Sequence, residues 1–340
     1  MGIVPLELQT NVILFITGVL LTGLLAVYCV FKFLAHIPRK PYKSELYYTT
    51  TTAKKGEFSK LLPLPDANSP ASSDIILSVV IPCYNETGRL KVMLDEAIAF
   101  LTQTQNLANA FEILIIDDGS KDKTFEYALG IAESYGLAPG IFRAVKLEQN
   151  RGKGGAVTHG LQYTRGKYSI FADADGASKF SDVLKLIEGV EKHQSKKLSE
   201  ETPVVAIGSR AHMVNTDAVV KRSFIRNFLM YSLHSLLFIF GIRSVRDTQC
   251  GFKLFNKSAI KNIFPYMHNE RWIFDVEILI LALRKGIVIE EIPISWHEVS
   301  GSKVDLARDS VNMAIDLVVI RFAYMLGIYL DHDKKGSKKD

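Results

Sequence analysis

The chain has 340 residues, of which 48% are hydrophobic and 23% charged, and a formal net charge of +5. That length is enough for one large domain or two ordinary ones with a hydrophobic core. The modest positive charge favours a membrane surface and an anionic substrate over nucleic acid. The three cysteines, Cys29, Cys83 and Cys250, are far apart and lack metal-binding spacing, which indicates a reducing compartment and excludes a disulfide framework.

The N-terminal part of the chain contains a nearly continuous apolar stretch at residues 11–33. Its length is that of a helix able to cross the hydrocarbon core of a bilayer. The basic residues of this region lie at or beyond the C-terminal end of the stretch: Lys32, Arg39, Lys40 and Lys43. This asymmetry predicts a retained single-pass anchor rather than a cleaved signal peptide, with a luminal N-terminus and a cytosolic remainder.

Residues 75–172 repeat a pattern of apolar strand, polar turn and helix. Strands are predicted at 75–82, 111–116, 142–147 and 168–172, and helices at 90–101, 124–135 and 156–164. This repetition is typical of an α/β protein with an open parallel sheet and helices on both faces. A polar cluster follows each of the four strands, at the edge of the sheet where such folds bind ligands. We therefore expect a ligand site along that edge.

The fourth strand ends at two aspartates, Asp173 and Asp175, which are separated by one residue. If the strand conformation continues, both side chains point the same way. Two adjacent carboxylates repel each other unless a cation lies between them, and hard divalent ions such as Mg²⁺ or Mn²⁺ prefer oxygen ligands. The motif is short, so two solvated turn aspartates are the alternative interpretation.

The other polar clusters suit a nucleotide. A carboxylate such as Asp117 can accept a hydrogen bond from a base or from a ribose hydroxyl. Glycines within residues 151–155 let the backbone approach a ligand closely, and Arg151 and Lys153 add positive charge for phosphates. The spacing matches neither the P-loop nor the dinucleotide-binding fingerprint. Each cluster alone is compatible with an ordinary turn, but together they predict a nucleotide with a metal-bridged diphosphate.

Four segments, residues 78–86, 117–120, 152–154 and 173–175, resemble the successive motifs of the inverting glycosyltransferases of family 2. The resemblance implies their GT-A fold, a Rossmann-like, open and mostly parallel sheet with helices on both faces. The anchor, the turn after the fourth strand and residues 245–253 are similar to the branch of that family that transfers glucose from UDP-glucose to dolichyl phosphate at the endoplasmic reticulum. The implied product is a β-linked dolichyl glucosyl phosphate for the assembly of N-glycan precursors.

The resemblance implies roles for individual residues. The nucleotide would be lined by Pro82, Tyr84, Glu86, Asp117, Asp118 and Lys153. Among these, Asp117 would read the uracil. Asp173 would contact the ribose or the metal, and Asp175 would bind the metal. Ala177 replaces a glutamine that can bind the metal in mannosyl relatives, so substrate phosphates and water are expected to fill that position.

The second half of the chain is expected to serve the acceptor and the membrane. A strand predicted at 204–208 leads to Arg210, which we expect to clamp a phosphate rather than to lie free at the surface. Residues 221–242 predict an amphipathic helix in the bilayer interface, with a core helix as the alternative. By the resemblance, Asp247 approaches the acceptor side of the sugar. An ionised acceptor phosphate is already a nucleophile, so Asp247 is expected to position the acceptor or the metal, or to act as a weak base.

The C-terminal part completes this organisation. A strand at 287–294 contains a proline and is predicted at the edge of the sheet. By the resemblance, Ser302 and Lys303 belong to a phosphate-binding loop that can close over the site. Residues 311–330 predict an interfacial or docking helix, followed by a basic tail. The expected organisation is an N-terminus and anchor at 1–36, a linker at 37–74, a GT-A domain at 75–310 and a membrane-associated end at 311–340.

The expected reaction is a single in-line displacement that converts an α-linked donor into a β-linked product. Asp175, Asp247 and Arg210 are the expected catalytic residues, and the metal and Arg210 would stabilise the departing diphosphate. Two other interpretations stay open: mannose transfer from GDP-mannose to the same acceptor, and an inactive membrane-tethered nucleotide-binding scaffold. A processive polysaccharide synthase is disfavoured, because those enzymes carry several spans after the catalytic domain and a Gln-x-x-Arg-Trp signature, and here His268 stands in place of the glutamine. The residues also leave the oligomeric state open, homo-oligomers included.

Overall fold

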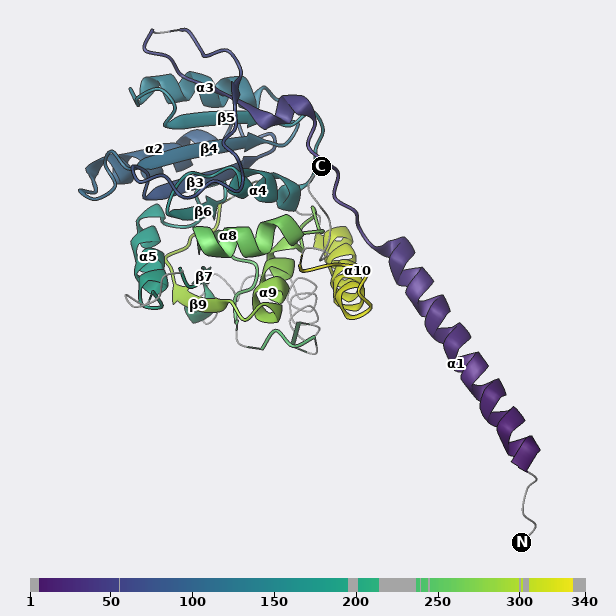
Figure 1. Ribbon diagram of the computed structural model, residues 1–340. Helices are drawn as coiled ribbons and strands as arrows, with labels where there is room; N and C mark the ends of the chain where they lie inside the picture. Colours follow the sequence, from purple (N-terminus) through teal and green to yellow (C-terminus); the bar gives the residue numbers. More distant parts are fainter. Residues whose placement is uncertain are drawn as a thin grey trace.

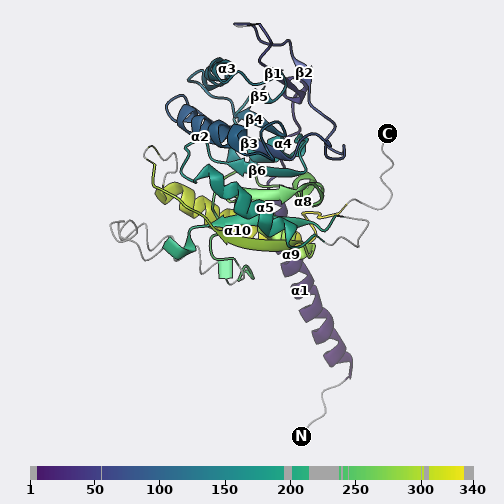
Figure 2. The same cartoon turned by 90° about the vertical axis from the view of Figure 1, so that its left-hand side faces the viewer.

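Short apolar stretches in which every residue is buried form the central strands of a sheet, as in β3 (Leu77–Cys83) and β4 (Phe111–Asp117). Strands buried on both faces are typical of parallel sheets covered by helices. The structure, a computed structural model, describes residues 6–54, 56–194, 201–213, 237–238, 240–243, 245–299, 301 and 306–332. Within those ranges nine strands form one sheet, which Figure 1 and Figure 2 show in two orthogonal views.

The strand order is β2-β1-β5-β4-β3-β6-β8-β7-β9. The other strands are β1 (Tyr47–Thr50), β2 (Leu62–Pro63), β5 (Phe142–Lys146), β6 (Tyr168–Ala172), β7 (Val204–Ser209), β8 (Phe252–Asn256) and β9 (Val288–Pro293). β5, β4, β3 and β6 are parallel, whereas β8 is antiparallel to β6 and to β7. The expected open, mostly parallel α/β sheet is confirmed, and β9 lies at its edge as predicted.

Helices cover both faces of the sheet because successive strand residues point to opposite sides. Val79 and Ile81 of β3 share a hydrophobic cluster with α2, α3 and α5, while Val80 shares the opposite cluster with α4, α8 and α9. The helices of the body are α2 (Leu90–Gln103), α3 (Thr124–Ser134), α4 (Lys153–Gln162), α5 (Val183–Glu191), α8 (Lys257–Ile263), α9 (Phe274–Arg284) and α10 (Leu306–Met325). The chain therefore has one layer of helices on each side of the sheet, as Figure 1 shows.

The path of the chain creates a crevice between β3 and β6. From β3 the chain moves outward through β4 to β5, and α4 then returns it to β6 on the other side of β3. Ligands bind off the carboxyl ends of the strands where the strand order reverses in this way. The turns that follow β3, β4, β5 and β6 therefore meet at one place.

Three local features differ from the sequence prediction. β8 was not predicted, because Lys253 interrupts its apolar pattern; inside the sheet the lysine is fully buried and paired with Asp275 at 2.5 Å. α4 begins at Lys153, three residues earlier than expected. The segment predicted as a linker contributes β1, which pairs with β5, while the expected domain boundaries themselves stay a prediction.

Helix α1 (Leu6–Leu34) extends away from the body in both views. Among the described residues it is the one helix long and apolar enough to cross a membrane, over Thr10–Leu34, and none of that stretch is buried. Its C-terminal end meets α10, where the rings of Phe31 and Phe322 stack with their centroids 4.5 Å apart. α10 itself buries Leu317 against the body and exposes Val311 and other apolar residues. The predicted C-terminal helix is thus present and lies beside the root of the candidate anchor.

Some predicted features lie outside the described residues. These are most of the helix expected at 221–242, both Ser302 and Lys303, and the basic tail after residue 332. Their expected roles at the membrane and at the phosphates stay predictions.

The close packing of α4 on the sheet gives a stability test. A Cβ added at Gly160 would clash with Val80 and lie 2.9 Å from Ile116 Cγ1, whereas one added at Gly130, in α3, meets nothing within 4 Å. We expect Gly160→Ala to lower the free energy of unfolding by about 1–3 kcal/mol through overpacking. Gly130→Ala should raise it by about 0.5–1 kcal/mol, since alanine is the better helix former. Thermal and denaturant unfolding in detergent would measure both, and equal effects of the two would contradict the packing of α4.

Candidate active site

Asp117, at the end of β4, is a buried acid. Its residue is 1% exposed, and neither carboxylate oxygen has a well-aligned hydrogen-bond partner in the described part of the chain. Burial raises the pKa of Asp117, against smaller opposing effects of Ser120 and Lys146. A buried carboxylate without donors is costly. This position is therefore suited to a ligand that supplies N–H or O–H groups.

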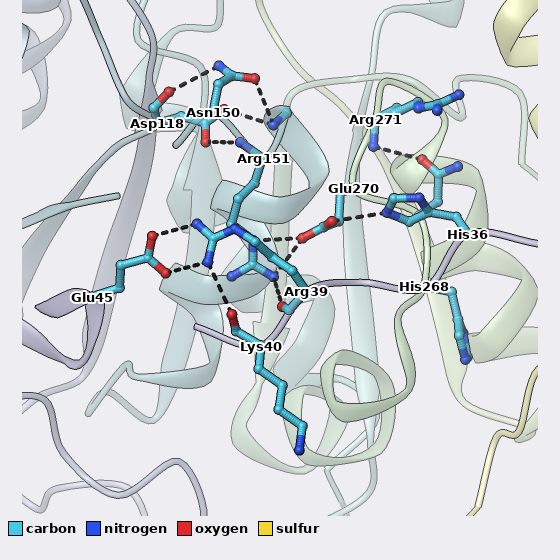
Figure 3. Close-up of polar contacts among 12 residues, drawn as sticks. His36, Arg39, Lys40, Glu45, Asp118, Asn150, Arg151, His268, Glu270 and Arg271 are labelled. Carbon is cyan, nitrogen blue, oxygen red and sulfur yellow. Dashed lines mark hydrogen bonds and ion pairs between the residues drawn. The ribbon is translucent and has the colours of Figure 1, made fainter. Parts of the chain in front are cut away.

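The neighbouring Asp118 shapes the loop between β5 and α4. Its carboxylate accepts hydrogen bonds from the backbone N–H groups of Arg151, at 2.7 Å, and of Gly152, at 2.9 Å (Figure 3). The side-chain amide of Asn150 donates to the Asp118 carbonyl oxygen at 3.0 Å. Burial raises the pKa of Asp118 from 3.8 to about 7. The structure thus places Asp118 behind the predicted nucleotide site, holding the loop that carries Lys153.

The predicted acid pair at the end of β6 faces two cations. Lys153 Nζ lies 2.7 Å from Asp173 Oδ1, and Arg89 Nη1 lies 3.7 Å from Asp175 Oδ2. The side chains of Asp173 and Asp175 are 34% and 26% exposed, so solvent and ligands can reach both. Burial would lower the pKa of Lys153, but Asp173 and other nearby acids outweigh it and hold the pKa above its ordinary value.

Arg89 is a site residue that the sequence analysis missed. It forms two hydrogen bonds to the Glu86 carboxylate, at 2.8 and 2.7 Å, and so fixes an acid predicted to line the nucleoside. The only signal for this pair was the spacing of three residues at a helix start. A Cβ added at Gly301 would lie 3.9 Å from Arg89 Nη1, so the described beginning of the predicted phosphate loop is close to Arg89.

The other predicted nucleoside residues belong to the same turn. Pro82 is buried within β3, and Tyr84, which follows the strand, is half-buried. Asn85 adopts a positive φ of 53°, and its side-chain oxygen accepts a hydrogen bond from the Lys121 backbone N–H at 2.8 Å. The turn after β3 is thereby tied to the turn after β4.

Arg210 and Asp247, both predicted as catalytic, form a bidentate pair. Arg210 Nε and Nη2 donate to the two Asp247 carboxylate oxygens at 2.7 and 2.9 Å, and the Arg210 backbone N–H adds a third hydrogen bond at 2.9 Å. Burial would raise the pKa of Asp247, but Arg210 outweighs it and holds the pKa below its ordinary value. Asp173 also acts on the Arg210 charge, so this pair and the acids at the end of β6 share one electrostatic site.

Gly251 lies directly against the first of those acids. Its carbonyl accepts a hydrogen bond from the Asp173 backbone N–H at 3.2 Å, and a Cβ added at Gly251 would overlap the Asp173 carboxylate. This contact explains why a glycine stands within the segment 245–253 that carried the family resemblance. Spacing alone gave no indication of the contact, because β8 brings residue 251 beside residue 173 from far along the chain.

A second buried ion pair lies beneath the acids. Lys253 and Asp275 are 0% and 5% exposed, and Lys253 Nζ also donates to the Cys250 carbonyl oxygen at 2.7 Å. Asp275 contributes to the raised pKa of Lys153, after Asp173. The charges of Asp173, Lys153, Asp275 and Lys253 therefore alternate in sign, which lowers the cost of holding each of them in a site of low polarity.

The glycine-rich segment 151–155 departs from its predicted role. Its glycines were expected to admit a ligand, yet a Cβ at Gly152 would clash with the Glu270 carbonyl oxygen, and one at Gly154 would lie 2.5 Å from Phe274 Cβ. The glycines therefore make room for the protein segment before α9. Arg151, expected beside phosphates, instead pairs with Glu270 at 2.6 Å. Of the two predicted cations, Lys153 alone faces the acid pair.

The acid pair can hold a hard divalent cation only together with a ligand. Within the described ranges, no group of three or more His, Cys, Asp or Glu side chains could hold a metal ion. Asp173 and Asp175 provide two carboxylates, and Ala177 adds no side-chain donor. Mg²⁺ is bound in many sites by one or two carboxylates, with substrate phosphates and water completing its shell. The residues present fit that kind of site.

The sheet and this charged edge define a glycosyltransferase with the GT-A fold. The model of the family described as Glycosyl transferase family 2 matches residues 78–264, more than half of the chain. The chain belongs to that family, and the predicted family is confirmed.

Relatives cover most of the chain. It is 58% identical over 313 residues to a dolichyl-phosphate beta-glucosyltransferase of Saccharomyces cerevisiae, with 91% of this chain and 93% of the relative covered. It is 42% identical over 255 residues to a Homo sapiens protein of the same name, with 74% and 77% covered. A solved glucosyl-3-phosphoglycerate synthase from Mycobacterium tuberculosis, in complex with Mn²⁺, UDP-glucose and phosphoglyceric acid, has a TM-score of 0.49 at 16% identity, covering 73% of this chain and 79% of that one.

The Gly251 contact predicts a sensitive position away from the acid motif. In Gly251→Ala the new methyl group would displace the Asp173 carboxylate, and a misplaced site group can cost about 100-fold in turnover. Gly88→Ala is the control, because a Cβ there meets nothing within 4 Å. We expect kcat to fall in the first variant and to stay near that of the unaltered protein in the second. Unchanged turnover in Gly251→Ala, with an unchanged melting temperature, would contradict the role of this contact.

Proposed function

We propose that the chain transfers glucose from UDP-glucose to dolichyl phosphate with inversion and so forms dolichyl β-D-glucosyl phosphate for N-glycan precursors. The observation that carries the proposal is that Asp173 interacts with both Lys153 and Arg210 at the edge of the sheet where β4 ends in Asp117, a buried acid without a well-aligned donor among the described residues. The names of the relatives, which this chain matches over most of their length, supply the sugar and the acceptor.

The proposal assigns recognition of the base to Asp117. Uracil offers an N–H group, and the Asp117 carboxylate is a buried acceptor without a well-aligned donor among the described residues. Guanine offers N–H groups as well, so Asp117 does not choose between UDP and GDP. The choice of glucose over mannose follows the names of the relatives, and UDP as the carrier follows the family resemblance.

The cations around the acid pair suit a departing diphosphate. Lys153 and Arg210 carry positive charge into a partly buried site, where each interaction with a phosphate oxygen is stronger than in water. A divalent cation, Mg²⁺ or Mn²⁺, would be held by Asp173 and Asp175 and would act there as a Lewis acid on the diphosphate. Arg210 is fixed by Asp247, which limits the reorganisation needed as charge develops.

Asp247 holds other groups in position rather than abstracting a proton. Its lowered pKa keeps it ionised at neutral pH, and both of its oxygens are engaged by Arg210. The acceptor phosphate is itself largely ionised, with a second pKa near ~6. A displacement at the anomeric carbon by such an oxyanion needs no proton transfer to a base. Asp247 therefore orients Arg210 and the acceptor side of the sugar.

The membrane geometry suits a lipid acceptor. Helix α1 would anchor the chain as a single span in the endoplasmic reticulum membrane, with the catalytic domain in the cytosol by the positive-inside rule. α10 lies beside the root of α1 and exposes Val311, Ile315 and Met325, which would face lipid at the interface. The phosphate of dolichyl phosphate would then reach the site while the lipid chain stays in the bilayer.

The donor preference can be measured directly. Purified full-length protein in detergent, with Mg²⁺, dolichyl phosphate and either radiolabelled UDP-glucose or GDP-mannose, should form labelled lipid from UDP-glucose with at least about 100-fold higher kcat/KM. The lipid product would be identified by mass spectrometry and its β linkage by NMR. Preference for GDP-mannose would refute the proposal, and no transfer from either donor would favour the scaffold interpretation.

The acid pair should be required for transfer but not for folding. We expect Asp175→Asn to lower turnover by about 100-fold or more, because it weakens the binding of the divalent cation and of the diphosphate. Chelation by EDTA should have a similar effect on the unaltered protein. Asp95→Asn, at an exposed surface pair with Lys91, is the control and should retain activity. Normal turnover of Asp175→Asn at an unchanged melting temperature would exclude the acid pair from the reaction.

A further inference from the structure

The segment that follows the candidate anchor, residues 36–45, runs back along the catalytic domain and is called the juxtamembrane strap here. Arg39 donates to the fully buried Glu45 carboxylate at 2.8 and 2.5 Å. Glu45 in turn accepts a hydrogen bond from the Glu148 backbone N–H at 2.9 Å, and its carbonyl lies 2.9 Å from His159 Nε2. Glu45 of the strap therefore contacts the chain on both sides of Lys153, at Glu148 and at His159.

Glu270 joins this strap to the loop before α4. Figure 3 shows its carboxylate between Arg151 and His36. Arg151 Nε lies 2.6 Å from one carboxylate oxygen, and His36 Nε2 lies 3.0 Å from the other. Arg151 Nη2 also donates to the Arg39 carbonyl oxygen at 3.0 Å. Three segments that are distant in sequence thus meet at one carboxylate.

The charges of Arg151 and Glu270 are paired with each other and largely buried. The side chains of Arg151 and Glu270 are 7% and 10% exposed. Burial would raise the pKa of Glu270, but His36 and Arg151 outweigh it and hold the pKa below its ordinary value, so the carboxylate is ionised. Removing one partner of such a pair leaves a buried charge uncompensated.

The loop held by Glu270 is the one that presents Lys153 to the acid pair. Gly152 takes a φ of 87° and accepts no Cβ beside the Glu270 backbone, and the Gly155 N–H donates to the Glu270 carbonyl oxygen at 3.1 Å. Asp118 fixes the opposite side of the same loop. The position of Lys153 therefore depends on Asp118 from the sheet and on Glu270 from the segment before α9.

Ser44 of the strap also borders a pocket close to Asp117. A pocket of about 300 Å³ is lined by Ser44 and Tyr47 together with Gly119 and Ser120, which closely follow Asp117 in the chain. On the membrane side, the His36 backbone N–H donates to the Tyr329 hydroxyl oxygen at 2.8 Å. The strap thus runs from the Tyr329 contact near the end of α1 to the edge of a pocket close to Asp117.

We propose that the juxtamembrane strap is a working part of the donor site, and that Glu270 and Arg151 are positioning residues through which the docked strap holds Lys153 for UDP-glucose. The inference rests on the proposed function and extends it: the anchor does more than keep the enzyme at the membrane, because its root completes the scaffold that binds the nucleotide diphosphate. The acceptor side, served by Arg210 and Asp247, makes no contact with Glu270 in the described residues.

The test compares donor and acceptor binding in the full-length protein in detergent micelles, with a short-chain polyprenyl phosphate as acceptor. Glu270→Gln keeps the size of the side chain and removes its charge. We expect it to raise the KM for UDP-glucose and the Kd for UDP, measured by calorimetry with Mg²⁺, by about tenfold, and to leave the acceptor KM within about twofold. His36→Ala removes only the partly exposed partner and should raise both donor constants by about threefold.

Lys54→Gln is the control, because it removes a positive charge from an exposed surface pair with Glu57, outside the strap. It should leave the donor and acceptor constants unchanged. Donor constants equal to those of the unaltered protein in both Glu270→Gln and His36→Ala would overturn the inference. A fall in kcat that matches the fraction of unfolded protein, with unchanged donor constants, would overturn it as well. If UDP binding weakens as expected but the unaltered protein transfers no glucose, the proposed function fails and the strap stands; if the unaltered protein does not bind UDP, both fail.

Discussion

Two carboxylates one residue apart at the end of a buried strand repel each other, and the cations around them offset that repulsion. Lys153 from α4 and Arg89, which directly precedes α2, face Asp173 and Asp175, at 2.7 and 3.7 Å. The buried pair of Lys253 and Asp275 continues the alternation of charge beneath them. In a partly buried site such pairing offsets the repulsion between the two acids. The proposed donor site is therefore built from oppositely charged groups of the protein itself.

The balance depends on topology as much as on composition. β8 runs antiparallel between β6 and β7, and it delivers Gly251 to the side of Asp173 and Lys253 to the space below. A parallel strand in that place would need a long crossover and would present its other end to the site. The single reversed strand next to the switch point thus lets a motif far along the chain complete the site begun by the first four strands.

The sequence was sufficient for features that follow local rules and insufficient for those that depend on distant contacts. β6 was predicted with its observed bounds, because its run of buried apolar residues ends abruptly at Asp173. β8 was missed, because a lysine within an apolar stretch normally indicates an exposed position. The sequence did not show that Asp275 would pair with Lys253 in the interior. The glycines of 151–155 were identified correctly as positions of close approach, but the partner is the segment before α9 and not a ligand. Arg151 was misassigned for the same reason, because its charge is neutralised by Glu270, a residue more than a hundred positions away.

The proposed function has its acceptor in a bilayer, and an enzyme acting there must control its orientation as well as its attachment. A lone helix joined by a flexible linker would hold the domain near the membrane but leave its rotation free. Here the root of α1 is fixed at several points: Phe31 stacks on Phe322, His36 contacts Tyr329 and Glu270, and Arg39 pairs with a fully buried acid. Each of these contacts costs conformational entropy, and attachment to a membrane alone would not require them. The contacts make sense if the angle between α1 and the sheet matters, since that angle determines where the acid pair lies relative to the lipid surface.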